Sequence, residues 1–448
     1  MKFITDYRLE RFIRNTRWEE LPEPVQERLR GCMLDLLGAL IAGSGSGQFK
    51  AGLRLSRSAF PPGEIAVLGA EDRSSFLGAA AAMGHASNAY DIDDGHNIIR
   101  AHPGTSFIGG LLAAGYDKDL PAQDFLTALY VTYETTIRMG EAIMDYYQYA
   151  HSSGTFGAVG VAAGAGRIYG LDEGQLNNVL SISEFNAPLV PGIRSVEYPS
   201  MNKDGVPFGV MAGALALLAG GSGFTGNKHL LEAEEYRHYL DDLGTKHEVM
   251  ALYFKPYPCC RWGHPAIDAC LTLLREFGIS PEDIEQVTIE TFFKATQLSK
   301  GVPSCADEAQ YNIAYPVASA ILNRGFSIAQ VENTADRRVH QMMERLRFVC
   351  DPELDRQFPA RRLCRAIIER KDGRQFVSDV HEPRGEAGEH IGYSWLAEKF
   401  QRITAGRLIK PQQERLTSLL HGDDWTVRQL VDTTNRCLLC APPAPFPS

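Results

Sequence analysis

The feature that most constrains the fold is a succession of apolar segments with helical spacing, joined by short connections that contain glycine. In residues 25–42, large apolar side chains recur every three or four positions, which places them on one face of a helix. A stop signal, Gly43-Ser44-Gly45, follows directly. The pattern continues to Gly221 and is typical of a helical bundle. The further helices that it predicts end near Tyr90 and span 106–115, 122–147, 155–169, 172–185 and 206–221.

The pattern changes after residue 251, where strand signals appear. Residues 284–292 alternate apolar and polar side chains and are rich in β-branched residues, as expected of a strand. Two more candidate strands, 363–370 and 375–380, flank Asp372-Gly373, a dipeptide that favours a hairpin turn. Strands mixed with helices indicate a smaller α/β domain in this part of the chain.

The domain limits follow from these changes. The smaller α/β domain is predicted to span 257–392, beside a larger helical domain. Helical spacing returns after residue 393, so we expect the helical domain to combine 1–256 with 393–440. Residues 441–448 form a proline-rich tail. The predicted fold class is mainly α, with a smaller α+β domain.

Length, charge and cysteine usage narrow the class of protein. A chain of 448 residues is too long for one compact core. Its net charge of −10 disfavours nucleic acids and anionic membranes as partners. The nine cysteines are an odd number, which favours reduced thiols and a cytoplasmic location. Neither a signal peptide at residues 1–20 nor a membrane span is predicted.

Residues 85–106 hold three carboxylates, three histidines and an arginine between two apolar segments. We expect this loop to line a cleft and to supply acid and base groups for a small carboxylate substrate. Asp91 and Asp94 would share one face if the preceding helix continued through them. A metal site is the alternative, although the spacing matches no known metal motif, and we predict none. Its ligands would be Asp91, Asp94, His96 and His102.

Three histidines directly precede predicted helix starts, namely His102, His151 and His264. Helix N-termini carry unpaired N–H groups and partial positive charge, so a histidine there can bind an anion or move a proton beside it. Cations occur in similar places. Lys203 lies in a loop that opens a helix, and prolines beside Tyr257 fix the segment that holds Lys255 and Arg261.

The ordered set of these segments resembles the MmgE/PrpD family over about residues 21–380. This family includes 2-methylcitrate dehydratase, cis-aconitate decarboxylase and iminodisuccinate epimerase. The matching segments are Asn88–Asp94, His102-Pro103-Gly104, His151 before Gly154-Thr155-Phe156-Gly157, Lys203, Gly223–Gly226, Lys255–Arg261 with His264 and Asp268, and Tyr315 before Ala318.

The resemblance implies a mainly α fold with an α+β lid on the large helical domain, and a homodimer without a cofactor. It also implies a catalytic site made of Asp91, His102, His151, Lys203, Lys255 and Tyr315, and we add Asp94, Arg261 and His264 as substrate-binding residues. Two positions depart from the pattern. Gly95 stands where dehydratase and decarboxylase members usually have Thr or Ser, and Val206 stands where they tend to have His.

These observations predict a cofactor-free lyase that removes a proton next to a carboxylate of a small di- or tricarboxylate. His151 is the predicted base, Asp91 orients a histidine, and His102 or Tyr315 is the acid. Dehydration is the favoured reaction, with decarboxylation and epimerisation as alternatives. A metal-dependent hydrolase and a non-catalytic carboxylate-binding protein are the alternatives from other classes.

Overall fold

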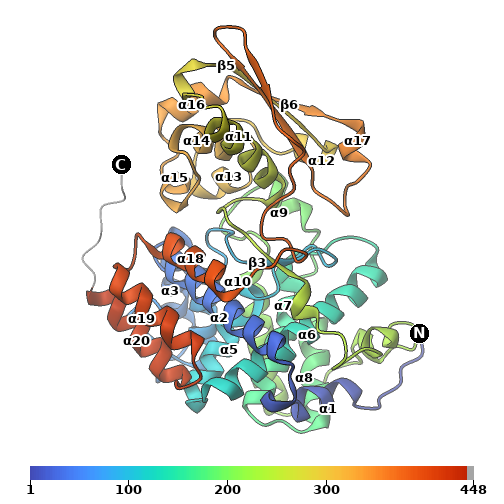
Figure 1. The fold of residues 1–448 in the computed structure, drawn as a ribbon. Helices are drawn as coiled ribbons and strands as arrows, with labels where there is room; N and C mark the ends of the chain where they lie inside the picture. The colour runs from blue at the N-terminus through green and yellow to red at the C-terminus, as the bar shows by residue number, and fades with distance from the viewer. Residues whose placement is uncertain (441–448) are drawn as a thin grey trace.

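The computed structural model describes residues 1–440, which form a large helical part below a smaller part that contains a sheet (Figure 1). Both chain ends build the helical part, since α18, α19 and α20 pack beside α2 and α5. Its helices are α1 (Arg8–Asn15), α2 (Glu23–Gly43), α3 (Gly47–Ala59), α4 (Phe76–Ser87), α5 (Thr105–Lys118), α6 (Ala122–Tyr147), α7 (Ser153–Ile168), α8 (Glu173–Phe185), α9 (Ile193–Glu197), α10 (Val206–Gly221), α18 (Tyr393–Thr404), α19 (Lys410–His421) and α20 (Val427–Cys440).

Small residues let these helices pack closely. A Cβ atom added at Gly209 of α10 would lie 2.2 Å from the backbone oxygen of Gly154 in α7. The two helix backbones therefore touch directly, which only glycine at this contact permits. The predicted segment 206–221 coincides with α10. Among residues 1–440, no helix combines the length and apolar character needed to cross a membrane.

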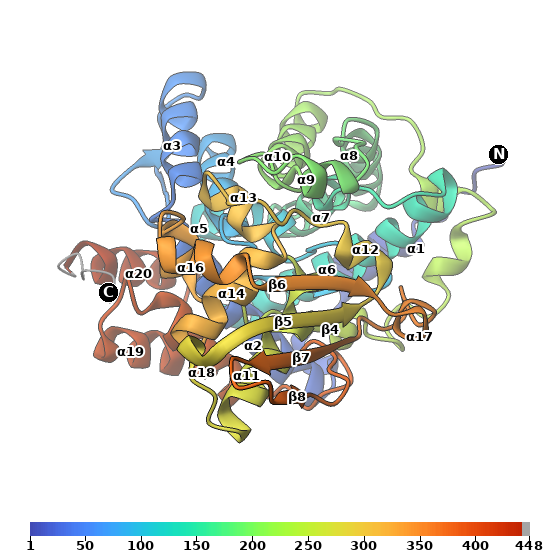
Figure 2. The same cartoon turned by 90° about the horizontal axis from the view of Figure 1, so that it is seen from above.

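The smaller part is a four-stranded sheet with helices packed beneath it, as the view from above shows (Figure 2). The strand order is β6-β5-β7-β8; β5 and β6 are parallel, and the other pairs are antiparallel. The strands are β5 (Ile284–Thr291), β6 (Leu346–Cys350), β7 (Cys364–Arg370) and β8 (Gln375–Val377). The helices are α11 (His264–Glu276), α12 (Phe293–Thr296), α13 (Ala306–Gln310), α14 (Ala314–Asn323), α15 (Ile328–Glu332), α16 (Arg337–Met343) and α17 (Pro352–Asp355).

Two strand pairs lie within the helical part. β1 (Ile65–Ala66) pairs with β2 (Arg73–Ser74), and β3 (Asp94–His96) pairs with β4 (Leu252–Phe254), both antiparallel. Short 3₁₀ helices lie at Trp18–Glu20, Leu230–Glu232, Arg237–Leu240, Glu248–Ala251, Arg261–Gly263 and Pro281–Asp283.

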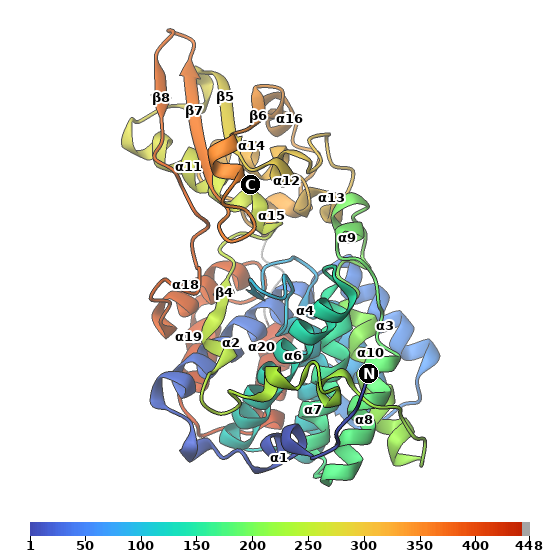
Figure 3. The same cartoon turned by 90° about the vertical axis from the view of Figure 1, so that its right-hand side faces the viewer.

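The β3–β4 pair positions the loop at 88–105 against the connection between the two parts (Figure 3). The chain leaves the helical part after β4, and the returning segment passes beside it, where the Phe254 N–H donates to the Gly385 carbonyl over 2.9 Å. These two crossings are held together by a backbone hydrogen bond, so the junction is an ordered place for a site.

The structure confirms the predicted fold class, mainly α with a smaller α/β part. The strands predicted at 284–292, 363–370 and 375–380 are β5, β7 and β8. The strand β6 was not predicted. We propose residues 257–392 as the limits of the smaller part, while the proline-rich segment 441–448 lies outside the described residues.

Candidate active site

The centre of the candidate site is a buried carboxylate, Asp91, that contacts two cationic side chains. Its Oδ2 lies 2.7 Å from the Lys255 ammonium, and its Oδ1 lies 3.4 Å from His102 Nε2. The side chains of Asp91 and Lys255 are 2% and 1% exposed. Asp91 has φ of +50°, because the chain turns sharply between the end of α4 and β3. Lys255 directly follows β4, so the β3–β4 pairing brings it to this turn.

The imidazole of His102 is fixed by its other nitrogen. Nδ1 lies 2.8 Å from the Asp94 carbonyl oxygen, which can only accept, so Nδ1 is the donor. Nδ1 also lies 3.1 Å from Oδ2 of Asp93. Nε2 is therefore the nitrogen that can exchange a proton with a bound molecule, and it faces Asp91.

Neighbouring carboxylates decide the charge of His102. Burial alone would lower the pKa of its imidazole, but Asp93 and Asp91 raise it well above the ordinary value, so the ring is protonated near neutral pH. Burial would likewise raise the pKa of Asp93, but His102, Lys255 and a hydrogen bond from Thr105 hold it below the ordinary value. Asp93 is thus a permanent anion behind the histidine.

Lys203 brings a second ammonium to the site and joins the two parts of the molecule. Its Nζ donates to the Ala89 carbonyl, just after α4, and to Oε1 of Gln310 over 2.6 Å. It also lies 3.6 Å from Asp307. Burial lowers the pKa of this ammonium, although Asp307 and Asp91 act in the opposite direction. Burial would lower the pKa of Lys255 too, but Asp91 and Asp93 raise it overall.

Two residues that sequence reasoning missed also lie at this cluster. Asp204 Oδ2 is 3.9 Å from His102 Nε2, and burial raises the pKa of its carboxyl. Burial, Asp204 and Asp91 together raise the pKa of Tyr311, whose buried hydroxyl has no hydrogen-bond partner within residues 1–440. Asp204 could have been suggested by its place directly after Lys203, whereas nothing in the sequence around Tyr311 marks it.

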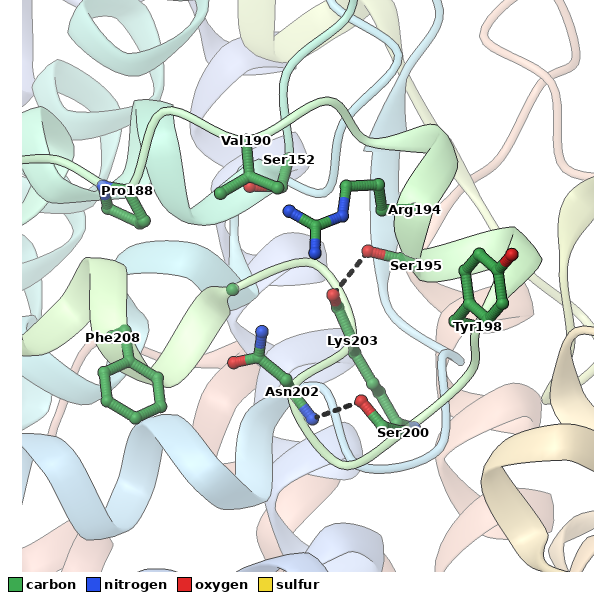
Figure 4. A pocket seen from close by; sticks show the side chains of 11 residues that line it. Ser152, Pro188, Val190, Arg194, Ser195, Tyr198, Ser200, Asn202, Lys203 and Phe208 are labelled. Carbon is green, nitrogen blue, oxygen red and sulfur yellow. Dashed lines mark hydrogen bonds between the residues drawn. The ribbon is translucent and has the colours of Figure 1, made fainter.

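A cavity of about 490 Å³ adjoins the cluster and is lined in part by Lys203 (Figure 4). Its wall comes from the start of α7, the 188–202 segment and the start of α10. The guanidinium of Arg194 points toward the middle of the space, above the side chain of Asn202. A cavity of this volume is large enough for a small organic acid.

His151 lies near this cavity, but no contact joins it to the cluster in the described part of the chain. Its ring packs against Tyr149, at 4.1 Å between ring centroids, and against Tyr147 and Phe156. Both ring nitrogens are buried without a hydrogen-bond partner in residues 1–440, and burial lowers the pKa of the imidazole. Its neighbour Ser152 lines the cavity.

The structure does not bring the other predicted site residues into the cluster. The Tyr315 hydroxyl donates to two backbone carbonyls of the smaller part, each over 2.8 Å. Arg261 pairs with Glu386 over 2.7 Å, and His264 Nε2 lies 3.0 Å from the Cys259 carbonyl oxygen. These contacts tie the junction together.

Asp94 also points away from Asp91. Its Oδ1 accepts from the Gly104 N–H over 3.0 Å at the start of α5, and its Oδ2 accepts from the Tyr133 hydroxyl. Burial raises the pKa of this carboxyl to about 7. The helix does not continue through Asp91 and Asp94, so they do not share a helix face: α4 ends at Ser87 and Asp94 begins β3.

The two unusual positions have clear surroundings. A Cβ atom at Gly95 would lie 2.2 Å from Cζ of Tyr253, its partner across β3 and β4, so the aromatic ring occupies the space of a side chain here. Val206 is fully buried at the start of α10 and belongs to the core of the helical part.

Three side chains of the cluster could together hold a metal ion. Asp91, His102 and Asp204 each offer one ligand atom, and these atoms lie within 4.8 Å of one another. The Lys255 ammonium opposes a cation at Asp91, and a protonated His102 cannot coordinate one. These side chains are therefore better suited to bind an organic acid and exchange protons with it than to coordinate a divalent cation.

Comparison with known families agrees with this architecture. The model of the MmgE/PrpD N-terminal domain matches residues 7–243, and that of the MmgE/PrpD C-terminal domain matches residues 257–421. A comparison with curated proteins found no match. The family includes dehydratases and related lyases and isomerases. The two matches cover most of the sequence, and the chain therefore belongs to the MmgE/PrpD family.

Proposed function

We propose that the protein is a cofactor-free lyase that removes a proton next to a carboxylate of a small di- or tricarboxylate, as 2-methylcitrate dehydratase does. One observation carries the proposal: a buried Asp91 joins a protonated histidine and a lysine beside a cavity, with a second lysine at its edge. A homodimer is part of the proposal, as expected for the family.

The two lysines meet the main energetic demand of such a reaction. Removing a proton from the carbon next to a carboxylate spreads negative charge onto that carboxylate. Ammonium groups fixed in a site that excludes water stabilise this charge much better than water does. Lys255 is 1% exposed and Lys203 is 3% exposed, so both can act at close range on a bound acid.

The reaction needs one group that is protonated and can act as an acid, and another that is unprotonated and can act as a base. His102 is protonated near neutral pH and presents Nε2, so it is suited to donate a proton to a departing hydroxyl group. His151 is the proposed base, because burial lowers its pKa and keeps the ring neutral. In dehydration the carbon–hydrogen and carbon–oxygen bonds break, the double bond forms, and the hydroxyl leaves as water.

The same groups support two related reactions. If a carboxylate departs as carbon dioxide and the carbanion takes up a proton, the reaction is a decarboxylation. If the proton returns to the opposite face, the product is an epimer. We favour dehydration, because a protonated His102 next to an anionic Asp91 is arranged to assist a leaving hydroxyl.

Proton NMR of a panel of di- and tricarboxylates incubated with the protein in D₂O tests the proposal. Alkene formation, carbon dioxide loss and deuterium uptake identify a dehydratase, a decarboxylase and an epimerase, respectively. We expect one acid to react at the same rate after treatment with a chelator. If activity is lost with the chelator and returns with a divalent cation, the metal-dependent alternative at Asp91, His102 and Asp204 holds instead.

A further inference from the structure

The cavity beside the cluster holds a cationic side chain that the proposed mechanism does not use. Arg194 lies at its edge, and Figure 4 shows the guanidinium directed toward the centre of the space. Within residues 1–440, this guanidinium has no ion pair or side-chain hydrogen bond. An arginine presented to a cavity without a partner is available to a ligand.

A second observation in the same cavity also points to a ligand. Ser152 lines the cavity and is 4% exposed, and its hydroxyl oxygen has no hydrogen-bond partner in the described part of the chain. A buried hydroxyl without a partner is costly unless something else satisfies it. The side-chain amide of Asn202 lies below Arg194 in the same view. A guanidinium, a hydroxyl and an amide thus converge on one space.

The cavity lies beside the catalytic cluster at two places. Lys203 lines the cavity, and its ammonium lies among the cluster residues. On the other side, Ser153, next to Ser152, accepts a hydrogen bond from the His102 N–H over 2.9 Å. A molecule bound at Lys203 therefore has the cavity next to it.

We propose that Arg194, with Ser152 and Asn202, binds a second carboxylate of the substrate, remote from the one at which the proton is removed. This inference rests on the proposed function, because the first carboxylate is the one placed at Lys203 and Lys255. A planar guanidinium matches the two oxygens of a carboxylate and can bind both. The apolar side chains of Pro188 and Val190 border the site.

The test is calorimetric binding of propane-1,2,3-tricarboxylate to the wild type, Arg194→Met and Arg194→Lys. Arg54→Met is the matched control, because Arg54 is exposed on α3 and far along the chain from the cavity. Loss of a charged hydrogen-bonding partner should weaken binding by Arg194→Met roughly ten- to a hundredfold. Arg194→Lys should fall between, and Arg54→Met should bind like the wild type.

The outcomes separate this proposal from the proposed function. Weaker binding to Arg194→Met supports the carboxylate site even if no acid of the panel reacts. Equal binding by the wild type and Arg194→Met overturns it even if turnover is found, and so does the absence of binding to the wild type. If inorganic phosphate displaces the tricarboxylate with equal affinity, the ligand class is wrong. With a reacting acid, Arg194→Met should raise KM while kcat stays within a few-fold.

Discussion

The buried pair of Lys255 and Asp91 makes a strong prediction about stability. The two charged atoms are 2.7 Å apart, which at an effective dielectric constant of about 20 gives an attraction of about 6 kcal/mol. Removing both charges from water offsets much of this attraction. Removing only one leaves the other buried without its nearest partner, although His102 still lies 3.4 Å from Asp91. We therefore expect Lys255→Met to lower the free energy of unfolding by about 3–5 kcal/mol.

Asp91→Asn should have a similar cost, because it leaves the Lys255 ammonium buried. The double variant Lys255→Met/Asp91→Asn should be more stable than the sum of the two single effects by at least about 2 kcal/mol, since neither charge is then left alone. Lys410→Met is a suitable control, because Lys410 is 77% exposed and lies 3.8 Å from Glu414. This variant should unfold at the same urea concentration as the wild type.

Urea-induced unfolding followed by circular dichroism at pH 7 measures all four variants. Additive costs in the double variant would show that Lys255 and Asp91 do not depend on each other. If Lys255→Met lowered the free energy of unfolding as little as Lys410→Met does, the loss of Lys255 would not leave a buried charge without its nearest partner. Either result would remove the electrostatic centre of the site.

Further predictions concern residues around the cluster. The pKa of Asp94 is raised from 3.8 to about 7, so its contribution to stability is complete below about pH 4 and is lost as the pH rises through 7. Asp94→Asn should remove this pH dependence of the melting temperature between pH 4 and 8. An unchanged pH dependence would contradict the prediction. Gly95→Ala should cost about 1–3 kcal/mol through overlap with Tyr253, and Tyr253→Ala should relieve much of that cost in urea unfolding. Lys399 lies 2.5 Å from Asp35 in the core and donates to the backbone carbonyl of Ile92, next to Asp91. Lys399→Met should lower the free energy of unfolding in urea by about 3–5 kcal/mol, because it leaves Asp35 buried without this partner. A loss below about 1 kcal/mol would contradict this.

Local sequence patterns were sufficient for most of the helical part. The limits of α10 and β5 follow from glycines, apolar spacing and β-branched residues, all of which act within a few positions. The strand β6 has no such signal, because it lies at the sheet edge and none of its residues is buried. Its place depends on pairing with β5, which is distant in sequence.

The candidate site likewise combines residues that local motifs predict with residues whose role depends on packing between distant segments. Asp91, His102, Lys203 and Lys255 were predicted, and the structure brings them together. The role of Tyr311 depends on the packing of the smaller part against the helical part, which no short motif encodes. The Tyr315 hydroxyl is taken by two backbone carbonyls for a similar reason, since its partners come from residues after α14.

The most direct test of the central claim compares His102→Asn with His238→Asn on the acid that reacts in the NMR panel. His238 is an exposed histidine outside the cluster, so its variant should react like the wild type. His102→Asn should lower kcat at least about a hundredfold, as expected for loss of a general acid. Equal rates for the two variants would contradict the assignment of the general acid to His102 in the Asp91–His102–Lys255 cluster.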